Sequence, residues 1–368
     1  MVEPPHTFAF IIHPINPKAD VSRKWPWLGR LLSERQIDFF SRFFPPVYIS
    51  EITGVRSEAT GVEARGWFIA APYTPRRMLE LPVDVVYKKI IACGRMAERL
   101  GARILGLGAF TSVVGDAGVT IARALDIPVT TGDSYTVHIA VASIREAARV
   151  MGVSLEGATA AVIGATGSIG AACAELLARD VPDLLLIGRR PDALEAVRAR
   201  CEGRRARLRT SLEVNDIREA DLILTVSSAI GPLINPAQLR PGAVVCDVAR
   251  PRDVAASVAQ ARDDVFVYDG GIVEVPGPVD FHFDFGFPPG MAYACMAETM
   301  ALALEGRFED YTLGKTIRVE QVDEIAGIAA RHGFRLNGFR SFEHDVTDAQ
   351  IARVRERAAQ NRRTWAGG

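Results

Sequence analysis

The stretch AAVIGATGSIGAACAELL, residues 160–177, decides the fold. An apolar run leads into three spaced glycines, and an amphipathic helical pattern follows them. The first glycine allows a tight turn, the second lets the backbone approach a pyrophosphate, and the third lets the helix pack closely on the strand. The helix N-terminus then offers N–H groups to phosphates. The pattern predicts the phosphate-binding turn of a Rossmann unit, although another doubly wound fold could contain such a turn. The expected cofactor-binding residues are Gly164, Thr166, Gly167, Ser168, Ile169 and Gly170.

Helices and strands alternate on both sides of this turn, which is typical of a parallel sheet. We therefore predict an α/β fold: a Rossmann-type doubly wound parallel sheet with an N-terminal α/β substrate domain and C-terminal helices. Three domains are predicted. Residues 1–150 form the N-terminal α/β substrate-binding domain, residues 151–288 form the NADP-binding Rossmann domain, and residues 289–368 form a C-terminal helical segment that carries a candidate nucleophile. Expected strands lie at 7–15, 63–73, 103–109, 127–131, 184–188, 221–227, 243–249 and 265–270. Expected helices lie at 83–100, 116–125, 134–151, 168–179, 191–201, 291–305, 319–332 and 347–362, with a helical hairpin within 25–46.

The segment after the second Rossmann strand indicates which cofactor binds. A site for NAD usually has an acidic residue here, whereas IGRRPDAL (187–194) offers Arg189 and Arg190. Guanidinium groups suit the 2′-phosphate of NADPH, although an arginine could simply be solvated beside the next helix. Further along, Ser227 in TVSSAIG (225–231) and Gly270 and Gly271 in YDGGIVE (268–274) follow strands, where ligands usually bind. They are cofactor-binding candidates, with plain turns as the alternative.

Composition narrows the class of protein. The 368 residues are 48% hydrophobic with a net charge of −1, so no overall field attracts nucleic acid or an anionic membrane. The basic runs 198–209 and 353–363 are expected to be solvated helix faces. Five scattered cysteines without a CxxC motif indicate neither a disulfide framework nor a metal site. With no signal-peptide pattern and no apolar stretch of about 20 residues, we expect a cytoplasmic protein without a transmembrane segment.

The chemistry could involve a cysteine. Cys295 lies in FPPGMAYACMAETMALALEG (287–306), where Pro289 and Gly290 are expected to start a helix. A helix N-terminus favours a thiolate, and a thiolate attacks thioesters. The same helix is apolar on nearly every face, so the residues alone favour a buried core cysteine. Other polar candidates are Ser112 in GLGAFTSVVGD (106–116) and Tyr135 in VTTGDSYTVH (129–138), where a helix N-cap explains much of the composition.

Several segments in order resemble the cyanobacterial long-chain acyl-[acyl-carrier-protein] reductases and their bacterial relatives. They span residues 50–335: EITGVRSEATG, LGAFTSVVGD, VTTGDSYT, the glycine turn, GGIVE, YACMAETMALALEG and ARHGF. The resemblance implies NADPH-dependent reduction of an acyl thioester to an aldehyde through a cysteine acyl-enzyme, with Cys295 as nucleophile. Ser112 becomes a candidate oxyanion donor. Tyr135, where the family has a histidine, becomes a candidate acid/base. The implied partners are an acyl carrier protein or coenzyme A thioester and an aldehyde-consuming enzyme.

Three segments depart from the family and leave the substrate open. They are VPGPVDFHFDFGFPPG (275–290), the N-terminal part with Trp25 and Trp27, and the charged tail after 340. One alternative is a shikimate- or amino-acid-dehydrogenase-like enzyme acting on a small carbonyl, imine or amino acid, in which Cys295 only packs. Another is a non-catalytic nucleotide-binding sensor.

Overall fold

Two units make up the chain, and each is built from three separate stretches. The computed structural model describes residues 6–14, 16–229 and 231–365. The N-terminal unit comprises residues 1–135, 273–316 and 323–335, and the Rossmann unit comprises 136–272, 317–322 and 336–368. This division differs from the three predicted domains. Residues 289–368 are shared between the two units, because the chain returns to each of them after leaving it.

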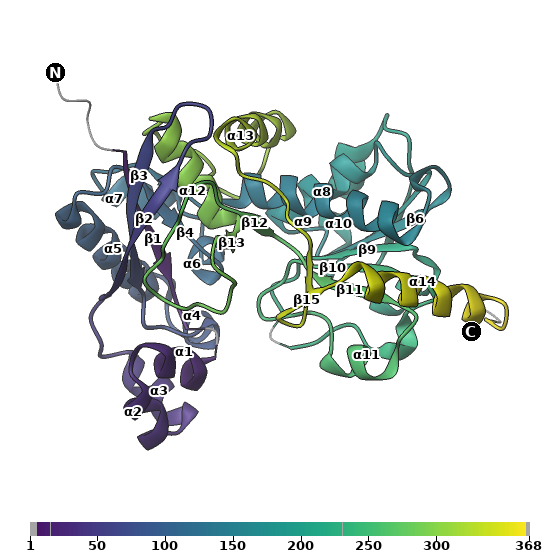
Figure 1. The fold of residues 1–368 in the computed structure, drawn as a ribbon, viewed down its shortest axis with the longest axis horizontal. Helices are drawn as coiled ribbons and strands as arrows, with labels where there is room; N and C mark the ends of the chain where they lie inside the picture. Colours follow the sequence, from purple (N-terminus) through teal and green to yellow (C-terminus); the bar gives the residue numbers. More distant parts are fainter. Residues whose placement is uncertain (1–5, 15, 230, 366–368) are drawn as a thin grey trace. The chain divides into compact units, whose positions relative to one another are not determined.

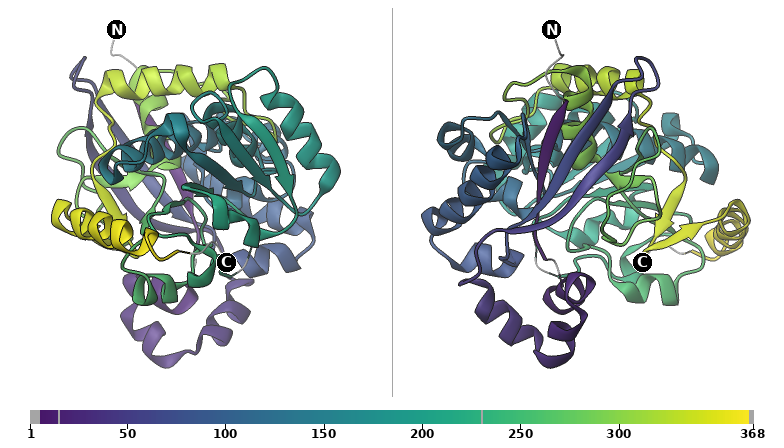
Figure 2. Two further views of the ribbon diagram at one scale, coloured as in Figure 1. Left: turned by 90° about the vertical axis from the view of Figure 1, so that its right-hand side faces the viewer. Right: turned by 60° about the vertical axis from the view of Figure 1, so that its left-hand side comes forward.

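The N-terminal unit contains a five-stranded sheet in the order β2-β3-β1-β4-β5 (Figures 1 and 2). Strands β3, β1, β4 and β5 run parallel, while β2 pairs antiparallel with β3 at one edge. The bounds are β1 (Thr7–Ile12), β2 (Val47–Arg56), β3 (Glu63–Ala70), β4 (Leu105–Leu107) and β5 (Val129–Thr130).

Helices cover both faces of this sheet. On one face, Ala9, Ile11 and Ile69 pack in a cluster with side chains of α5 (Val83–Leu100) and α7 (Val119–Ala124). On the other face lies α12 (Ala294–Glu305). A Cβ added to Gly106 of β4 would lie 2.2 Å from Thr299 Oγ1, so only glycine admits the helix there. The sheet therefore depends on a helix from much later in the chain.

Shorter elements complete the N-terminal unit. Two short helices lie within 25–46, where a helical hairpin was expected, and a third short helix precedes them. Pro17 and Pro26 each start a helix, and Ser33 caps the last of the three. They are α1 (Pro17–Lys24), α2 (Pro26–Leu31) and α3 (Glu34–Ser41). The remaining elements are α4 (Pro75–Glu80), α6 (Phe110–Val113), β13 (Met291–Tyr293), and parts of β12 (Ile272–Glu274) and α13 (Val319–His332), both of which cross the unit boundary.

The Rossmann unit has a six-stranded parallel sheet in the order β11-β10-β9-β6-β7-β8. When the strands are numbered along the chain with β6 as the first and the sheet is read from β8 to β11, the order is 3-2-1-4-5-6. This order is usual for dinucleotide-binding sheets. Its strands are β6 (Thr159–Ile163), β7 (Asp183–Ile187), β8 (Arg207–Ser211), β9 (Leu222–Thr225), β10 (Val244–Asp247) and β11 (Phe266–Asp269). Its helices are α8 (Asp133–Met151, from Thr136 onward), α9 (Ser168–Leu177), α10 (Pro191–Cys201), α11 (Ala256–Ala261) and α14 (Asp348–Arg362). The hairpin β14 (Phe339–Ser341)–β15 (His344–Val346) and the 3₁₀ turns Leu155–Gly157, Val214–Glu219 and Pro236–Gln238 complete it.

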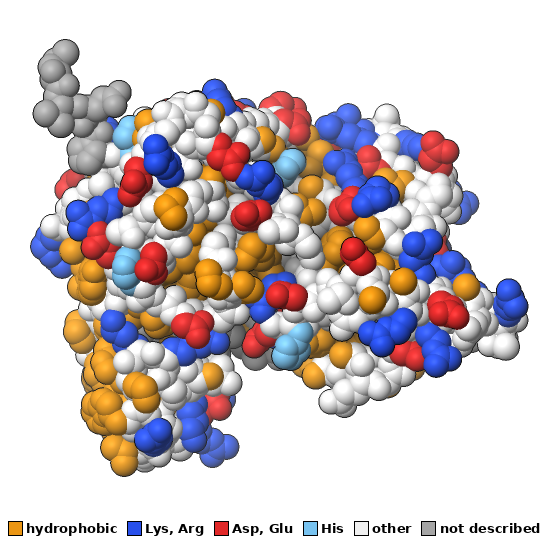
Figure 3. Space-filling view, in the orientation of Figure 1, with side chains coloured by type: hydrophobic (Ala, Val, Ile, Leu, Met, Phe, Trp, Pro, Cys, Tyr) orange, Lys and Arg blue, Asp and Glu red, His pale blue; other side chains and the backbone are white. Residues whose placement is uncertain are grey.

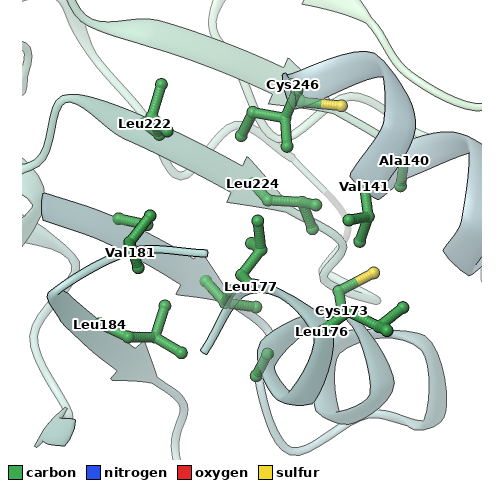
Figure 4. Close-up of a cluster of buried hydrophobic side chains, with 14 of the residues drawn as sticks. Ala140, Val141, Cys173, Leu176, Leu177, Val181, Leu184, Leu222, Leu224 and Cys246 are labelled. Carbon is green, nitrogen blue, oxygen red and sulfur yellow. The ribbon is translucent and has the colours of Figure 1, made fainter. Parts of the chain in front are cut away.

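Alternate residues of these strands enter two different cores, which confirms the predicted doubly wound sheet. Ala160 and Val162 pack with α8 and α9, whereas Ala161 and Ile163 pack with Val258 of α11 on the opposite face. Figure 4 shows the first core, where Val141 and Leu177 face Leu224. Both sheet faces are therefore covered, as the apolar strand sequences indicate.

Two local expectations are wrong. The helix expected at 291–305 begins only at Ala294, because Met291–Tyr293 is extended and forms β13, which pairs with β12. The basic run 198–209 is not one helix face: α10 ends at Cys201, and Arg207–Ser211 forms the edge strand β8. Within the described ranges, we find no helix that is both long and apolar enough to cross a bilayer.

Candidate functional site

The glycine turn has the geometry that a dinucleotide needs. Gly164 has a positive φ of 80°, and a Cβ there would lie 2.8 Å from the carbonyl oxygen of Val226. A Cβ on Gly170 would lie 2.2 Å from the Gly164 carbonyl oxygen, so glycine alone lets α9 start this close to β6. Because β6 and β9 are neighbours at which the strand order reverses, the turn lies at the switch point where such sheets bind ligands.

Gly167 is less crowded than the two packed glycines. It is exposed, and an added Cβ would meet only the Gly164 carbonyl oxygen, at 3.3 Å. Gly167 is also the N-cap of the ten-residue α9, so Ser168, Ile169 and Gly170 form its first turn. A phosphate could therefore approach these backbone N–H groups without meeting a side chain at Gly167. The residues present fit a pyrophosphate, and Thr166 lies half-buried beside them.

Arg189 and Arg190 follow β7 and are both exposed. Among the residues that the structure describes, neither guanidinium has a carboxylate partner, whereas Arg198 on the following helix pairs with Glu195 at 2.6 Å. Arg190 is also the backbone N-cap of α10. Two unengaged guanidiniums at the end of the second strand fit a 2′-phosphate.

The remaining cofactor candidates differ in whether contacts within the protein already occupy them. Ser227 Oγ donates to Asp253 Oδ1 at 2.5 Å, so its proton is held within the loop after β9. A Cβ on Gly270 would lie 2.7 Å from Cys246 Sγ, so that glycine serves close packing. Gly271 has a φ of 73°, and its added Cβ would meet nothing closer than 3.9 Å. Of these three, Gly271 is the one that leaves room for a ligand.

A second sheet edge, which carries polar side chains and a thiol, lies in the N-terminal unit. Because β1, β4 and β5 are parallel neighbours, their carboxyl ends meet at one edge of the sheet. His13 follows β1, the segment with Ser112 follows β4, and the segment Thr131–Tyr135 follows β5. Cys295 joins them at the start of α12: a Cβ on Gly132 would lie 2.3 Å from Cys295 Cα. The segment TTGDSY, residues 130–135, therefore packs directly on the backbone of Cys295, the candidate nucleophile.

Cys295 differs from the other cysteines in its exposure. All five cysteines are described and free, and only Cys295 is not fully buried. Burial of the sulfur is the main cause that raises the pKa of its thiol, to about 12, and the charges of Asp133 and Glu298 act in the same direction. The Met296 backbone N–H lowers that pKa by a smaller amount. The expectation that the helix N-terminus favours a thiolate is therefore not met, and the thiol is protonated at neutral pH.

Glu298 lies one helical turn after Cys295 and is completely buried. Its Oε1 accepts hydrogen bonds from the hydroxyls of Thr130 at 2.5 Å and Thr312 at 2.7 Å, and its Oε2 accepts one from the Tyr135 backbone N–H at 2.8 Å. Burial raises the pKa of this carboxyl above its usual value. Glu298 thus fastens α12 to the TTGDSY segment. Sequence reasoning missed it, although an acid in the middle of an apolar helix was a visible signal.

The two other predicted catalytic residues are both near this edge. Ser112 is buried, and its hydroxyl donates to the Ala109 carbonyl at 2.7 Å, so an oxyanion role would require that hydroxyl to rotate. Tyr135 is 2% exposed, and burial raises the pKa of its phenol well above the usual range. Proton transfer by Tyr135 would therefore have to start from the neutral phenol.

Two further polar side chains lie at this edge: His13, which was not predicted as a site residue, and Thr131, which belongs to the polar segment 129–138. His13 Nε2 accepts a hydrogen bond from the Phe110 backbone N–H at 3.1 Å, and burial lowers the pKa of His13 to about 4. It is therefore neutral at physiological pH and fixes the start of α6. The hydroxyl of Thr131, next to Gly132, is buried without a hydrogen-bond partner in the described structure. A buried hydroxyl without a partner is available to a ligand.

The described residues contain no group of three or more His, Cys, Asp or Glu side chains placed to hold a metal ion.

One family model matches the cofactor-binding region, and a curated relative is similar over most of the chain. The family model described as shikimate / quinate 5-dehydrogenase matches residues 145–270, which include the glycine turn. The long-chain acyl-[acyl-carrier-protein] reductase of Synechococcus elongatus is 29% identical over 332 residues, covering 86% of this chain and 94% of that protein.

Two other similarities are weaker or partial. The aminotransferase PigE of a Serratia species is 28% identical over 303 residues, so 81% of this chain matches 35% of that longer protein. The solved structure of L-tryptophan dehydrogenase from Nostoc punctiforme aligns with a TM-score of 0.43 and 15% identity, over 97% of this chain and 89% of that one.

The Rossmann geometry and the family match indicate a nicotinamide-dinucleotide module of the dehydrogenase type over residues 145–270. The resemblance expected from the motifs is confirmed over most of the chain. The protein is similar to a cyanobacterial long-chain acyl-[acyl-carrier-protein] reductase.

Proposed function

We propose that the protein reduces a fatty acyl thioester to the aldehyde with NADPH, through a thioester formed on Cys295. One observation carries this proposal. Of five cysteines, Cys295 alone is only half-buried as a residue, and it lies where α12 begins against Gly132, at a sheet edge lined by polar side chains. A purely structural cysteine would be expected to be buried like the other four.

The reaction begins with attack of Cys295 Sγ on the acyl carbonyl carbon. A new S–C bond forms, the bond from that carbon to the carrier sulfur breaks, and the carrier leaves as a thiol. When bound, NADPH supplies the hydride that reduces the resulting carbonyl. The thiohemiacetal on Cys295 then collapses, which releases the aldehyde and returns the thiol once a proton is taken up.

Cys295 must lose its proton to attack. Because its pKa is raised to about 12, a group has to accept that proton as the S–C bond forms. The carboxylate with the largest effect on the Cys295 thiol is Asp133, which makes it the candidate acceptor. The Met296 backbone N–H, which favours the thiolate, would stabilise the charge on sulfur. We place Ser112 and Tyr135 in supporting roles at this edge.

The Rossmann unit would hold the cofactor through three features. Gly167 and the first turn of α9 would take the pyrophosphate, and Arg189 with Arg190 would take the 2′-phosphate that distinguishes NADPH from NADH. Gly271 leaves space at the end of β11. The carrier of the acyl group is proposed to be an acyl carrier protein, as named for the Synechococcus relative, with coenzyme A as the other source of the same thioester.

The test is the intact mass of the protein after incubation with a long-chain acyl thioester in the absence of NADPH. We expect an added acyl mass that disappears when NADPH is supplied and aldehyde appears. The variant Cys295→Ala should show no adduct and no aldehyde. Cys201→Ala, which removes a buried thiol from the Rossmann unit, is the matched control and should be acylated like the unmodified protein.

A second candidate function, a dehydrogenase of a small carbonyl or amino acid substrate, rests on the family match, which is confined to residues 145–270 and is described as shikimate / quinate 5-dehydrogenase. In that case Cys295 only packs. No adduct with any chain length or carrier, together with oxidation or reduction of a small carbonyl or amino acid that survives in Cys295→Ala, would establish this candidate instead.

A further inference from the structure

Residues 17–44, which form α1, α2 and α3, carry a cluster of exposed apolar side chains. Trp27 and Leu31 lie one turn apart on α2, with exposed fractions of 58% and 72%. On and after α3, Phe39, Phe40, Phe43 and Phe44 are 43–68% exposed. We call these six side chains the aromatic patch. Figure 3 shows hydrophobic side chains gathered over α1–α3. Soluble surfaces rarely collect so many large apolar groups without a use.

The patch is the outer face of a well-anchored segment. Ile37 and Ser41 of α3 are buried on its inner face. Asp38 accepts a hydrogen bond from the Thr74 hydroxyl at 2.7 Å and pairs with Arg77 at 2.5 Å, both on or next to α4. Lys24 donates to the Ile49 carbonyl of β2. These helices therefore pack on the rest of the unit through their inner face, and the aromatic patch is not needed for that packing.

Charge around the patch is strongly one-sided. Residues 17–44 contain six Lys and Arg against three Asp and Glu, in a chain whose net charge is −1. All six cations are exposed: Lys18, Arg23, Lys24, Arg30, Arg35 and Arg42. Two of the acids are engaged, Asp38 with Arg77 and Asp20 with Arg23. Arg42 lies 4.0 Å and 4.7 Å from the ring centres of Phe39 and Phe43, so cation and aromatic groups share one surface.

We propose that the aromatic patch and its basic rim dock on an anionic lipid bilayer. Short amphipathic helices with Trp, Phe and Leu on one face and Lys and Arg around it lie in the headgroup region, with the apolar side chains below it. Anionic lipids attract the basic rim. The protein lies on the bilayer through this segment and does not span it. This inference rests in part on the function proposed above, in which the product is a long-chain aldehyde. Such an aldehyde partitions into lipid, so docking would place its release next to the bilayer.

The test is co-sedimentation of the full chain with vesicles, which needs neither substrate nor cofactor. We expect binding to vesicles of phosphatidylcholine with phosphatidylglycerol, weaker binding to phosphatidylcholine alone, and release by salt. The fluorescence of Trp27 should shift to shorter wavelength on binding, and this shift should be lost in Trp27→Ser.

Variants locate the contact. Phe43→Ser should weaken vesicle binding about tenfold, because one aromatic side chain leaves the lipid phase. Leu212→Ser removes a 51% exposed leucine from the Rossmann unit and should leave binding unchanged. Phe43→Ser should also keep the reductase activity on a water-soluble thioester, so a failure of the docking proposal is distinct from a failure of the proposed function.

Three outcomes would overturn the proposal. The first is no sedimentation with either vesicle. The second is that vesicles fail to bind, while an acidic acyl carrier protein binds and is released by Phe43→Ser, which would assign the patch to the carrier. The third is a dimer that Phe43→Ser converts to a monomer without any vesicle binding, which would assign the patch to a second copy of the chain.

Discussion

The parallel six-stranded sheet and the mixed five-stranded sheet of this protein place different groups at the carboxyl ends of their parallel strands. In the Rossmann unit the edge at β6 is formed by backbone: Gly164 and Gly170 pack within a few ångströms, and Gly167 is less crowded. In the N-terminal unit the corresponding edge is filled with side chains, among them the buried Glu298 and the half-buried Cys295. One edge suits an anionic ligand that approaches backbone N–H groups. The other suits a covalent step on a thiol held away from water.

Under the proposed function, this difference gives the two units separate tasks. A backbone cradle tolerates little change in shape, but it needs no particular protonation state. A desolvated thiol beside carboxylates depends on where the proton is, as its raised pKa shows. Changes at the first edge should therefore affect cofactor affinity, and changes at the second should affect acyl transfer. The predictions below test whether the two edges respond independently.

The largest effect is expected for Gly132→Ala. An added Cβ would overlap Cys295 Cα at 2.3 Å, and a φ of 75° disfavours alanine, so the Cys295 segment must move. Displacement of a nucleophile by about 1 Å can cost on the order of a hundredfold in rate. We expect acylation of Cys295, followed by intact mass over time, to slow by at least that factor while NADPH affinity stays the same.

The matched control for this variant is Gly101→Ala. Gly101 also has a positive φ, of 87°, but its added Cβ would meet nothing within 4 Å. It therefore reproduces the backbone strain without the overlap, and acylation should proceed normally. Equal slowing in both variants would show that the contact with Cys295 is unimportant.

The second effect concerns stability at acid pH. Burial lowers the pKa of His13 from 6.5 to about 4, so the unfolded chain binds a proton at this residue before the folded chain does. The free energy of unfolding should therefore fall as pH decreases from 6.5 to 4, by on the order of 3 kcal/mol from this residue.

Urea unfolding of the protein and of His13→Gln across that range measures the His13 contribution. The variant should be less stable at neutral pH and should show a shallower dependence on pH. Parallel curves would mean that His13 does not titrate as its burial indicates.

The smallest effect is expected at the cofactor arginines. Removal of one charge-assisted contact to the 2′-phosphate in Arg189→Ala or Arg190→Ala should weaken NADPH binding about tenfold and leave NADH binding unchanged. Arg198→Ala, which removes an arginine already paired with Glu195, is the control. Titration calorimetry measures the affinity of each variant for NADPH and for NADH. Equal losses for NADPH and NADH would exclude 2′-phosphate recognition.

The Rossmann unit could be predicted from sequence because its signals are local. The apolar strand, the glycines and the following helix lie within residues 160–177, and the structure has them as β6, the turn and α9. The expected helices over 319–332 and 347–362 also match α13 and α14 closely. The parallel direction of the strands followed from the helix–strand alternation, since parallel neighbours need crossover helices.

The N-terminal edge could not be predicted in the same way because its parts come from four distant segments. His13, Ser112, Gly132 and Cys295 meet only after β1, β4 and β5 pair and α12 packs on the sheet. The start of α12 was misplaced because β13 pairs with β12, a contact that local sequence does not show. The raised pKa of Cys295 likewise arises from burial, which no spacing pattern reveals.

The position of α12 has a consequence for how the chain is made. A ribosome completes all five strands of the N-terminal sheet by Thr130, but the helix that covers one face of that sheet begins at Ala294. The whole Rossmann sheet is synthesised in between. Until then, the face that contains Gly106 and Phe10 has no helix to cover it, and an apolar sheet face left bare during translation is prone to aggregate. The nascent chain is thus expected to depend on chaperones until α12 emerges.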